Sequence, residues 1–223
     1  MVQEWCEGFV SSGPPEDDNE WHLLVEHYAA IHSVTEASSC ELLSDAIANK
    51  GTLPSAMAYI DGLIPPIPMS ARPADLDRLL YRVKESVLPG WNPPPRSLCR
   101  VDPNPLNLIR LPATWKSVDW EYAGWGDPAA DLAEVIAFPE FIGVTEDSWN
   151  GFIESYAERV QDRQIASRVR RYRILVTMQW VLRFARIVAR ADRKDRMWEE
   201  PEGWQDLMVS RYAHYLHGIE QLI

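Results

Sequence analysis

The sequence of 223 residues contains no apolar run of the roughly 18 residues that a membrane helix requires. Its beginning, MVQEWCEGFV, includes acids and no basic residue, so we expect no secretory signal there. The only cysteines are Cys6, Cys40 and Cys99, and none of them has the CxxC spacing of a metal or redox site. These absences predict reduced thiols in a cytoplasmic protein without a membrane partner.

Acidic residues outnumber basic ones. The chain carries 22 basic and 33 acidic residues, which gives a net charge of −11. Because phosphate binding requires a basic surface, this balance argues against nucleic acid as a partner. It is compatible with a cationic substrate, although an acidic surface that only keeps the protein in solution explains the same charge. Hydrophobic residues (46%) and charged residues (25%) occur in the proportions of an ordinary globular protein.

Apolar residues recur at helical spacing over most of the chain, which predicts a mainly α-helical protein. Asp18 or Asn19 is a suitable cap for the first long helix. Pro73 suits the first position of a further helix, which Pro89-Gly90 ends. Residues 51–72 hold several prolines and little periodicity, so we expect an irregular crossing there, with one helical turn at most. The first long helix is predicted over residues 20–32. The other predicted helices cover residues 41–49, 129–137, 146–161, 163–192 and 203–222.

One β-hairpin is expected in the middle of the chain, which makes the predicted fold class mainly α with a small β-hairpin. The stretches 106–111 and 115–120 are short and apolar, and Pro112-Ala113-Thr114 separates them. Around a turn of three residues, residue 111 would face residue 115, and Asn107 would face Asp119. Directly opposed residues have Cβ atoms about 5 Å apart.

Three polar residues in this region suit phosphoryl transfer. Asn107 and Asp119 offer the oxygen ligands that Mg²⁺ prefers, so together they predict a site for one ion. Asp102 lies in the Pro-rich loop just before them, where a carboxylate can orient and deprotonate a hydroxyl group. Phosphoryl transfer uses these parts, because a metal neutralises the phosphates and a base aims the nucleophile.

The order and spacing of Asp102, Asn107 and Asp119 resemble the catalytic Asp, the metal-binding Asn and the metal-binding Asp of protein kinases. The run that begins at Asp119, DWEYAGWGDPAADLA, is similar to a motif of the aminoglycoside phosphotransferase and choline kinase family. Residues 2–8 resemble the hinge between the two lobes of that family, and the helix ending at His32 resembles the helix after the hinge. The resemblance covers essentially the whole chain.

The resemblance implies the C-terminal lobe of the protein-kinase-like fold, with the N-terminal lobe largely absent. Residues 1–223 would form this single lobe, with a hinge-like strand at 1–12, the catalytic and metal segment at 98–133 and a helical substrate-side region at 134–223. It also implies transfer of a phosphoryl group from ATP to a hydroxyl of a small molecule, such as an aminoglycoside, a choline-like compound or a sugar. The implied site residues are Asp102 as the base, Asn107 and Asp119 as Mg²⁺ ligands, Glu4, Trp5 and Cys6 at the adenine, and Arg100, Asp127 and Asp131 as structural support.

Other residues of the motif leave alternatives open. Glu121 would touch either the metal or the substrate, or neither. Trp120 and Trp125 would form either an aromatic surface for a cation or part of the hydrophobic core.

The sequence also lacks parts that the family usually has. No glycine-rich loop is present, no lysine precedes Lys50, and Arg100 stands where the family has a His two residues before the base. Three explanations remain: a truncated product or misplaced start, an N-terminal lobe supplied by another polypeptide, or a remnant that only binds. An exposed surface between lobes would favour association. Whether the chain is an enzyme or a non-catalytic binding module is therefore left open.

Overall fold

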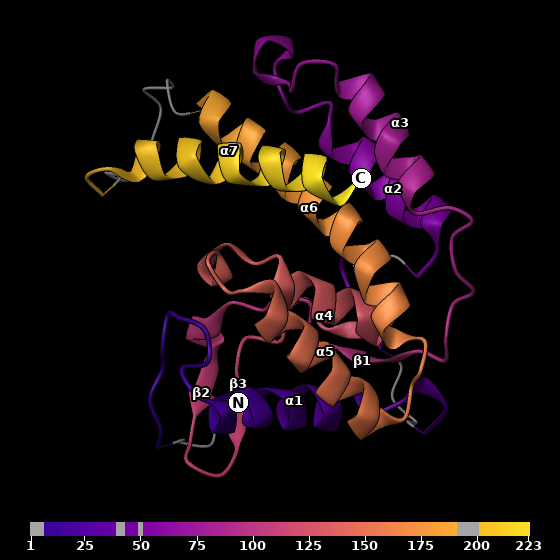
Figure 1. Cartoon of the computed structure of the whole chain (residues 1–223), viewed down its shortest axis with the longest axis vertical. Helices are drawn as coiled ribbons and strands as arrows, with labels where there is room; N and C mark the ends of the chain where they lie inside the picture. The colour runs from indigo at the N-terminus through magenta and orange to yellow at the C-terminus, as the bar shows by residue number, and fades with distance from the viewer. Residues whose placement is uncertain (1–6, 39–42, 49–50, 191–200) are drawn as a thin grey trace. The chain divides into compact units, whose positions relative to one another are not determined.

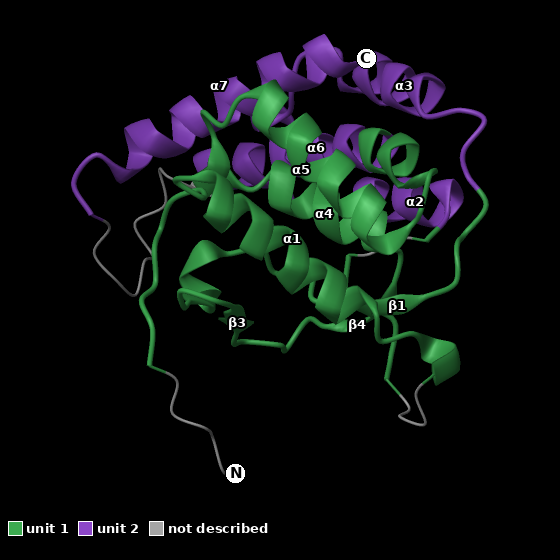
Figure 2. Ribbon diagram, turned by 60° about the horizontal axis from the view of Figure 1, so that its bottom comes forward, with its two compact units in different colours: residues 1–51, 92–170 green, residues 52–91, 171–223 purple. Residues whose placement is uncertain are grey.

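The computed structural model describes residues 7–38, 43–48, 51–190 and 201–223. These residues form mainly helices, together with two small antiparallel sheets (Figure 1). The chain divides into two compact units, one of residues 1–51 and 92–170 (unit 1) and the other of residues 52–91 and 171–223 (unit 2), coloured separately in Figure 2. The prediction of a single lobe over residues 1–223 stays a prediction.

The helices of unit 1 are α1 (Asp18–His32), α4 (Pro128–Ile136) and α5 (Glu146–Val160). Asp17 caps α1, because its side chain accepts a hydrogen bond from the Glu20 backbone at 2.8 Å. The predicted caps Asp18 and Asn19 are therefore wrong by one or two positions. Helices α1 and α5 lie side by side (Figure 1), and the rings of Trp21 and Trp149 meet edge to face at 5.2 Å.

Two sheets of two strands each lie in unit 1. Strand β1 (Ser97–Cys99) pairs with β4 (Gly124–Gly126), and β2 (Leu108–Arg110) pairs with β3 (Trp115–Ser117). The β2–β3 hairpin was predicted, but its predicted register is wrong by one residue, since Leu108 faces Ser117 and Arg110 faces Trp115. The cause lies in the turn, where Leu111 pairs with Thr114 rather than with Trp115, through a bond from the Leu111 N–H to the Thr114 carbonyl at 3.1 Å.

The predicted helix at 41–49 is wrong for the part that is described, residues 43–48. Asp45 instead forms a bridge beside Trp125 of β4, and the Ala46 N–H donates to the Trp125 carbonyl at 3.1 Å. This backbone passes so close to Gly124 that a Cβ there would lie 2.6 Å from the Ala46 nitrogen. Pairing with β4 therefore outweighs the local helical spacing.

Unit 2 contains α2 (Leu53–Leu63), α3 (Leu76–Ser86), α7 (Trp204–Leu222) and the part of α6 (Ile165–Arg190) from residue 171 onward. Helix α2 corrects the prediction of an irregular crossing over 51–72. Its start is fixed by a capping box in which Thr52 and Ser55 bond to each other's backbone N–H groups. The Arg183 guanidinium donates to the Tyr59 hydroxyl at 3.0 Å and links α6 to α2.

Pro73 is not the first residue of α3. A turn at residues 74 and 75 intervenes, and Asp75 has a left-handed backbone with φ of +53°, so the helix begins at Leu76. The remaining short helices are 3₁₀ turns at Glu36–Ser38, Met69–Ala71, Pro105–Asn107 and Pro139–Phe141. No helix of the described segments has the length and apolar character needed to cross a bilayer.

Candidate functional site

The loop that follows β1 carries the predicted base, and Asp131 of α4 holds its beginning. The Asp131 carboxylate accepts hydrogen bonds from the backbone N–H groups of Arg100 and Val101, both at 2.8 Å. Val101 has φ of +63°, a left-handed conformation that is unfavourable for a β-branched residue. The two bonds that Asp131 accepts help to hold this strained backbone directly before Asp102.

Asp102 and Asn107 are joined within the loop. The Asn107 Nδ2 donates to one carboxylate oxygen of Asp102 at 2.7 Å, and the Asn104 backbone N–H donates to the other at 3.2 Å. Pro105–Asn107 forms a 3₁₀ turn between the two residues. The Asp102 side chain is half-buried and is therefore oriented by two donors while part of it remains accessible.

Asp119 lies just beyond β3. The preceding Val118 N–H donates to the Asn107 carbonyl at 3.0 Å, so the backbones of the two predicted metal residues are adjacent. Direct opposition of Asn107 and Asp119 is nevertheless wrong, because the register places Val118 there and Asp119 leaves the strand with φ of +62°. The Asp119 side chain is exposed, so its carboxylate is accessible from solution.

Arg100 is fully buried beneath this loop. Its Nη2 donates to the Val118 carbonyl at 3.4 Å, and the hydroxyl of Tyr28 is a second partner of the guanidinium. Burial raises the pKa of Tyr28 well above its ordinary value, so this hydroxyl stays neutral. Arg100 therefore connects the loop that carries Asp102 with the segment that carries Asp119.

His32 is a residue of this site that sequence reasoning missed. Its Nε2 lies 3.1 Å from Asp131, and its Nδ1 lies 2.7 Å from the Tyr156 hydroxyl. Facing a carboxylate, Nε2 carries the proton and donates, which leaves Nδ1 to accept from Tyr156. Burial raises the pKa of Asp131, but the hydrogen bonds from His32, Arg100 and Val101 outweigh this and hold the pKa below its ordinary value. The signal available in the sequence was the position of His32 at the end of a helix resembling that of the family.

His32, Cys99 and Asp131 also bring three possible metal ligands within 4.8 Å of one another, all buried. Both ring nitrogens of His32 are already engaged in hydrogen bonds, and Asp131 already accepts three. This cluster is therefore better suited to hold the loop through hydrogen bonds than to bind an ion.

Asp127 begins α4. Its side chain accepts from the Ala129 N–H at 2.9 Å and forms a buried ion pair with Arg168 at 3.1 Å. The Arg168 guanidinium also donates to Asp162 at 2.8 Å, so a second carboxylate balances its positive charge. Asp127 thus fixes the start of the helix from which Asp131 reaches the loop.

The residues after Asp119 add an exposed polar and aromatic group. The Tyr122 hydroxyl is hydrogen-bonded to Glu121, which raises the pKa of this tyrosine, and the charges of Asp102 and Asp119 act on it in the same direction. Trp120 is partly exposed, whereas Trp125 is buried in the core. Of the two tryptophans considered as a cation-binding surface, only Trp120 is placed on the outside.

The oxygen atoms offered by this site are suited to a hard cation. The Asn107 amide uses its nitrogen to bond Asp102, which leaves its oxygen as an acceptor, and the exposed Asp119 carboxylate offers two more. Such amide and carboxylate oxygens are the ligands that Mg²⁺ accepts in proteins. The residues present therefore fit the predicted ion. Glu4, Trp5 and Cys6, predicted at the adenine, lie outside the described residues.

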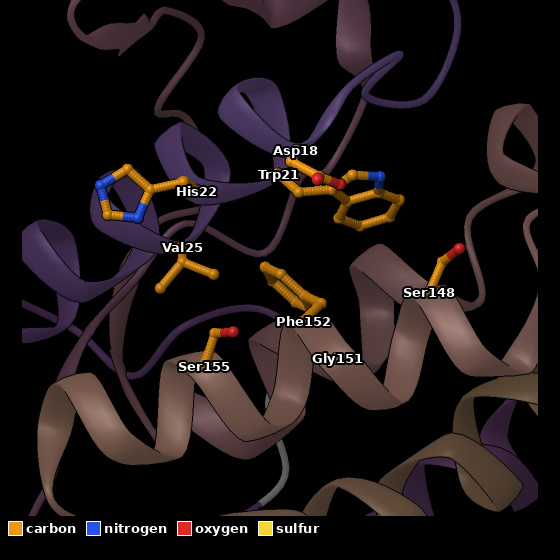
Figure 3. Close-up of a pocket in the computed structure, with 8 residues that line it drawn as sticks. All are labelled: Asp18, Trp21, His22, Val25, Ser148, Gly151, Phe152 and Ser155. Carbon is orange, nitrogen blue, oxygen red and sulfur yellow. The ribbon is translucent and has the colours of Figure 1, made fainter.

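A separate cavity of about 350 Å³ lies on the surface between α1 and α5 (Figure 3). Trp21 and Phe152 form part of its wall, and Asp18, His22, Val25, Ser148, Gly151 and Ser155 line the rest. None of the predicted catalytic, metal or support residues lines this cavity.

The family model described as "Phosphotransferase enzyme family" matches residues 1–175, which is more than half of the chain. The chain belongs to the phosphotransferase enzyme family. The match contains the loop at 100–107 and the segment around Asp119, as the resemblance of the motifs predicted. None of the curated proteins that were compared matches the chain at a significant level.

Solved structures agree with a kinase-like fold for this family member, as predicted. A choline/ethanolamine kinase family protein from Mesorhizobium loti matches with a TM-score of 0.66 and 18% identity, over 97% of this chain and 69% of that one. Choline kinase LicA from Streptococcus pneumoniae matches with a TM-score of 0.58 and 20% identity, over 90% and 63%. Spectinomycin phosphotransferase, in complex with ADP and spectinomycin, matches with a TM-score of 0.52 and 14% identity, over 93% and 69%. The chain spans less than two thirds of the LicA chain.

Proposed function

We propose that the protein transfers the γ-phosphoryl group of ATP to a hydroxyl of a small molecule. The observation that carries this proposal is the hydrogen bond between Asp102 and Asn107. Both residues lie in the segment that follows β1, and Asp119 lies just beyond the neighbouring strand β3. Membership of a phosphotransferase family gives the reaction class. The spacing and the contacts of these three residues supply the chemistry that the reaction needs.

Each of the three residues has a role in the proposal. Asp102 accepts the proton of the attacking hydroxyl and aims its oxygen, since two donors fix the carboxylate in the loop. Asn107 and Asp119 hold Mg²⁺, which when bound would neutralise charge on the phosphates. Asp131 and Asp127 act as supports, the former by holding the Arg100 and Val101 backbone and the latter by fixing the start of α4.

ATP as the donor is supported by the nucleotides of structural neighbours. LicA has been solved in complex with AMP, and spectinomycin phosphotransferase in complex with ADP. In this proposal the segment Glu4, Trp5 and Cys6 contacts the adenine, as the resemblance to the family hinge implies. Reduced thiols and ATP use both suit a cytoplasmic location.

A small hydroxyl compound that carries positive charge is the proposed acceptor class. Two neighbours are named for choline or ethanolamine and one for spectinomycin. The net charge of −11 and the exposed acids Asp119 and Glu121 favour a cation over an anion at this site.

Replacement of Asp102 tests the proposal. Transfer of radiolabelled phosphate from ATP to choline, ethanolamine and spectinomycin is measured for the wild-type chain and for Asp102→Asn. We expect a loss of about 100-fold or more in Asp102→Asn, because general base catalysis contributes on that order. Asp61→Asn removes an exposed carboxylate of α2 and serves as the control. An unchanged rate in Asp102→Asn would remove the base assignment.

A second candidate is a non-catalytic lobe that binds a partner, and one observation favours it. Leu106, Val118, Trp120 and Tyr122, which we call the apolar rim, expose large side chains beside Asn107 and Asp119 in the chain. Such residues are typical of a surface that another lobe or protein covers. Calorimetry with Mg²⁺ and ATP separates the two candidates. Clear binding of the nucleotide favours the phosphotransferase. No nucleotide binding, together with no phosphate transfer to any acceptor, favours the non-catalytic lobe.

A further inference from the structure

Arg100 belongs to a closed ring of contacts. The ring contains Asp102, Asn107 and Val118, the residue directly before Asp119. Its guanidinium donates to the Val118 carbonyl, and the Val118 N–H donates to the Asn107 carbonyl. The Asn107 side chain donates to Asp102, which is joined to Arg100 through Val101. Val118 directly precedes Asp119, so the ring links the base, the amide and the carboxylate.

The burial of Arg100 makes this link unusual. The side chain has 0% exposure, and its Nε and Nη1 atoms find no hydrogen-bond partner in the described part of the chain. Leaving donors of a buried cation unsatisfied is costly, so stability alone does not account for an arginine here. His27, which lies within electrostatic range, is neutral at pH 7 and therefore adds no second positive charge beside Arg100.

We infer that Arg100 is a positioning residue that sets the place of Asp119 relative to Asp102 by holding the Val118 carbonyl. This inference rests on the proposed function, because it takes Asp119 as a ligand of Mg²⁺. The long side chain reaches from the end of β1 to the end of β3, and among the described residues it is the donor to that carbonyl. Without it, the Val118 N–H bond to Asn107 alone holds this segment, so that bond opens more often.

The alternative role, a buried charge without a positioning effect, predicts the opposite sign for metal binding. Removing a positive charge near a cation site strengthens cation binding, because Coulomb repulsion is lost. Loss of positioning weakens it, because the oxygen ligands no longer converge. The direction of the change in metal affinity therefore decides between the two roles.

The experiment uses Mn²⁺ as the probe, with electron paramagnetic resonance on the full chain. For Arg100→Met we expect about tenfold weaker binding of Mn²⁺, and for Arg100→Lys, which keeps the charge and one donor group, a smaller loss. Arg159→Met is the control, since it removes one positive charge from an exposed ion pair with Glu26 in the same unit. Stronger or unchanged binding in Arg100→Met would overturn the inference.

Amide hydrogen exchange tests the same inference without any metal. In Arg100→Met we expect exchange at the Val118 amide to be at least tenfold faster, with the amides of α5 unchanged. Equal exchange in the two proteins would overturn the inference even if the variant folds less well elsewhere. Asp119→Ala tests the proposed metal site separately from the role of Arg100. If this variant binds Mn²⁺ as tightly as the wild type, or if the wild type binds none, the metal assignment of the proposed function fails. Hydrogen exchange in Arg100→Met still tests the role of Arg100 in either case.

Discussion

Val101 occupies a left-handed backbone conformation that glycine adopts without steric cost. Its φ of +63° brings the branched Cβ close to the backbone, which costs about 1–3 kcal/mol for such residues. Glycine at this position would remove the strain but would add conformational freedom to the unfolded chain, at about 0.5–1 kcal/mol. We therefore expect Val101→Gly to raise the free energy of unfolding by about 1 kcal/mol, measured by urea denaturation.

Val34→Gly is the matched control for that prediction. Val34 is also partly exposed but is not among the residues with positive φ, so only the entropic cost of glycine applies there. A loss of stability at Val34 together with a gain at Val101 supports strain before Asp102. Equal losses at both positions would show that the Val101 backbone is not strained.

His27 is expected to make stability depend on pH. Burial lowers the pKa of this imidazole to about 4 against an ordinary value of 6.5, and the nearby charge of Arg100 adds to the effect. Between these two values the unfolded chain binds a proton that the folded chain does not. Stability that is present above pH 6.5 is therefore lost as pH falls toward 4, by about 1.4 kcal/mol per pH unit from this group.

Urea denaturation at a series of pH values between 4 and 8 measures this slope. We expect His27→Gln to flatten it, whereas His22→Gln, on the exposed side of the same helix, is the control for the loss of one imidazole. A slope that persists in His27→Gln would assign the pH dependence to other groups.

At the scale of elements, two glycines are expected to respond to alanine with opposite signs. In β4, a Cβ on Gly124 would lie 2.6 Å from the Ala46 nitrogen and 2.8 Å from the Asp45 carbonyl carbon, both of them backbone atoms that cannot rotate away. In α5, Gly151 has no atom within 4 Å of such a Cβ. Thermal and urea denaturation should give a loss of about 2–3 kcal/mol for Gly124→Ala and a gain of about 0.5–1 kcal/mol for Gly151→Ala. A tolerated Gly124→Ala would mean that residues 44–46 do not pack against β4.

The long helices could be predicted from the sequence because their apolar periodicity lasts over several turns. Helices α5, α6 and α7 begin and end within three residues of the predicted limits. Helix α2 was missed because proline was taken as a breaker, although Pro54 lies in the first turn, where its missing N–H costs nothing. The segment at 43–48 has helical spacing, but its partner strand is about 80 residues away in the chain.

The candidate site could also be predicted only in part. The spacing of Asp102, Asn107 and Asp119 could be recognised in the sequence because these residues lie within one loop and one hairpin. The register of that hairpin was not predictable, since a difference of one residue in the turn shifts every pair. The role of His32 was hidden for a different reason: its partner Asp131 is 99 positions away, and only folding brings the two together.

For the whole molecule, charge and exposed apolar surface oppose each other. The net charge of −11 favours separate chains in solution, and repulsion falls as salt is added. The apolar rim favours contact, since Leu106 is 54% exposed and Trp120 is 38% exposed. We therefore expect self-association that increases with both protein concentration and salt, measured by sedimentation equilibrium.

Replacement of two rim residues locates the surface responsible. Leu106→Ser combined with Trp120→Ser should weaken self-association by about tenfold or more, because hydrophobic contact contributes roughly 25 cal/mol for each Å² of apolar surface that is buried. Met69→Ser combined with Tyr81→Ser is the matched control in unit 2, where these side chains are 77% and 63% exposed. If exposure alone drove association, the control pair would have the larger effect. A loss confined to the rim pair would instead assign association to the residues beside Asn107 and Asp119.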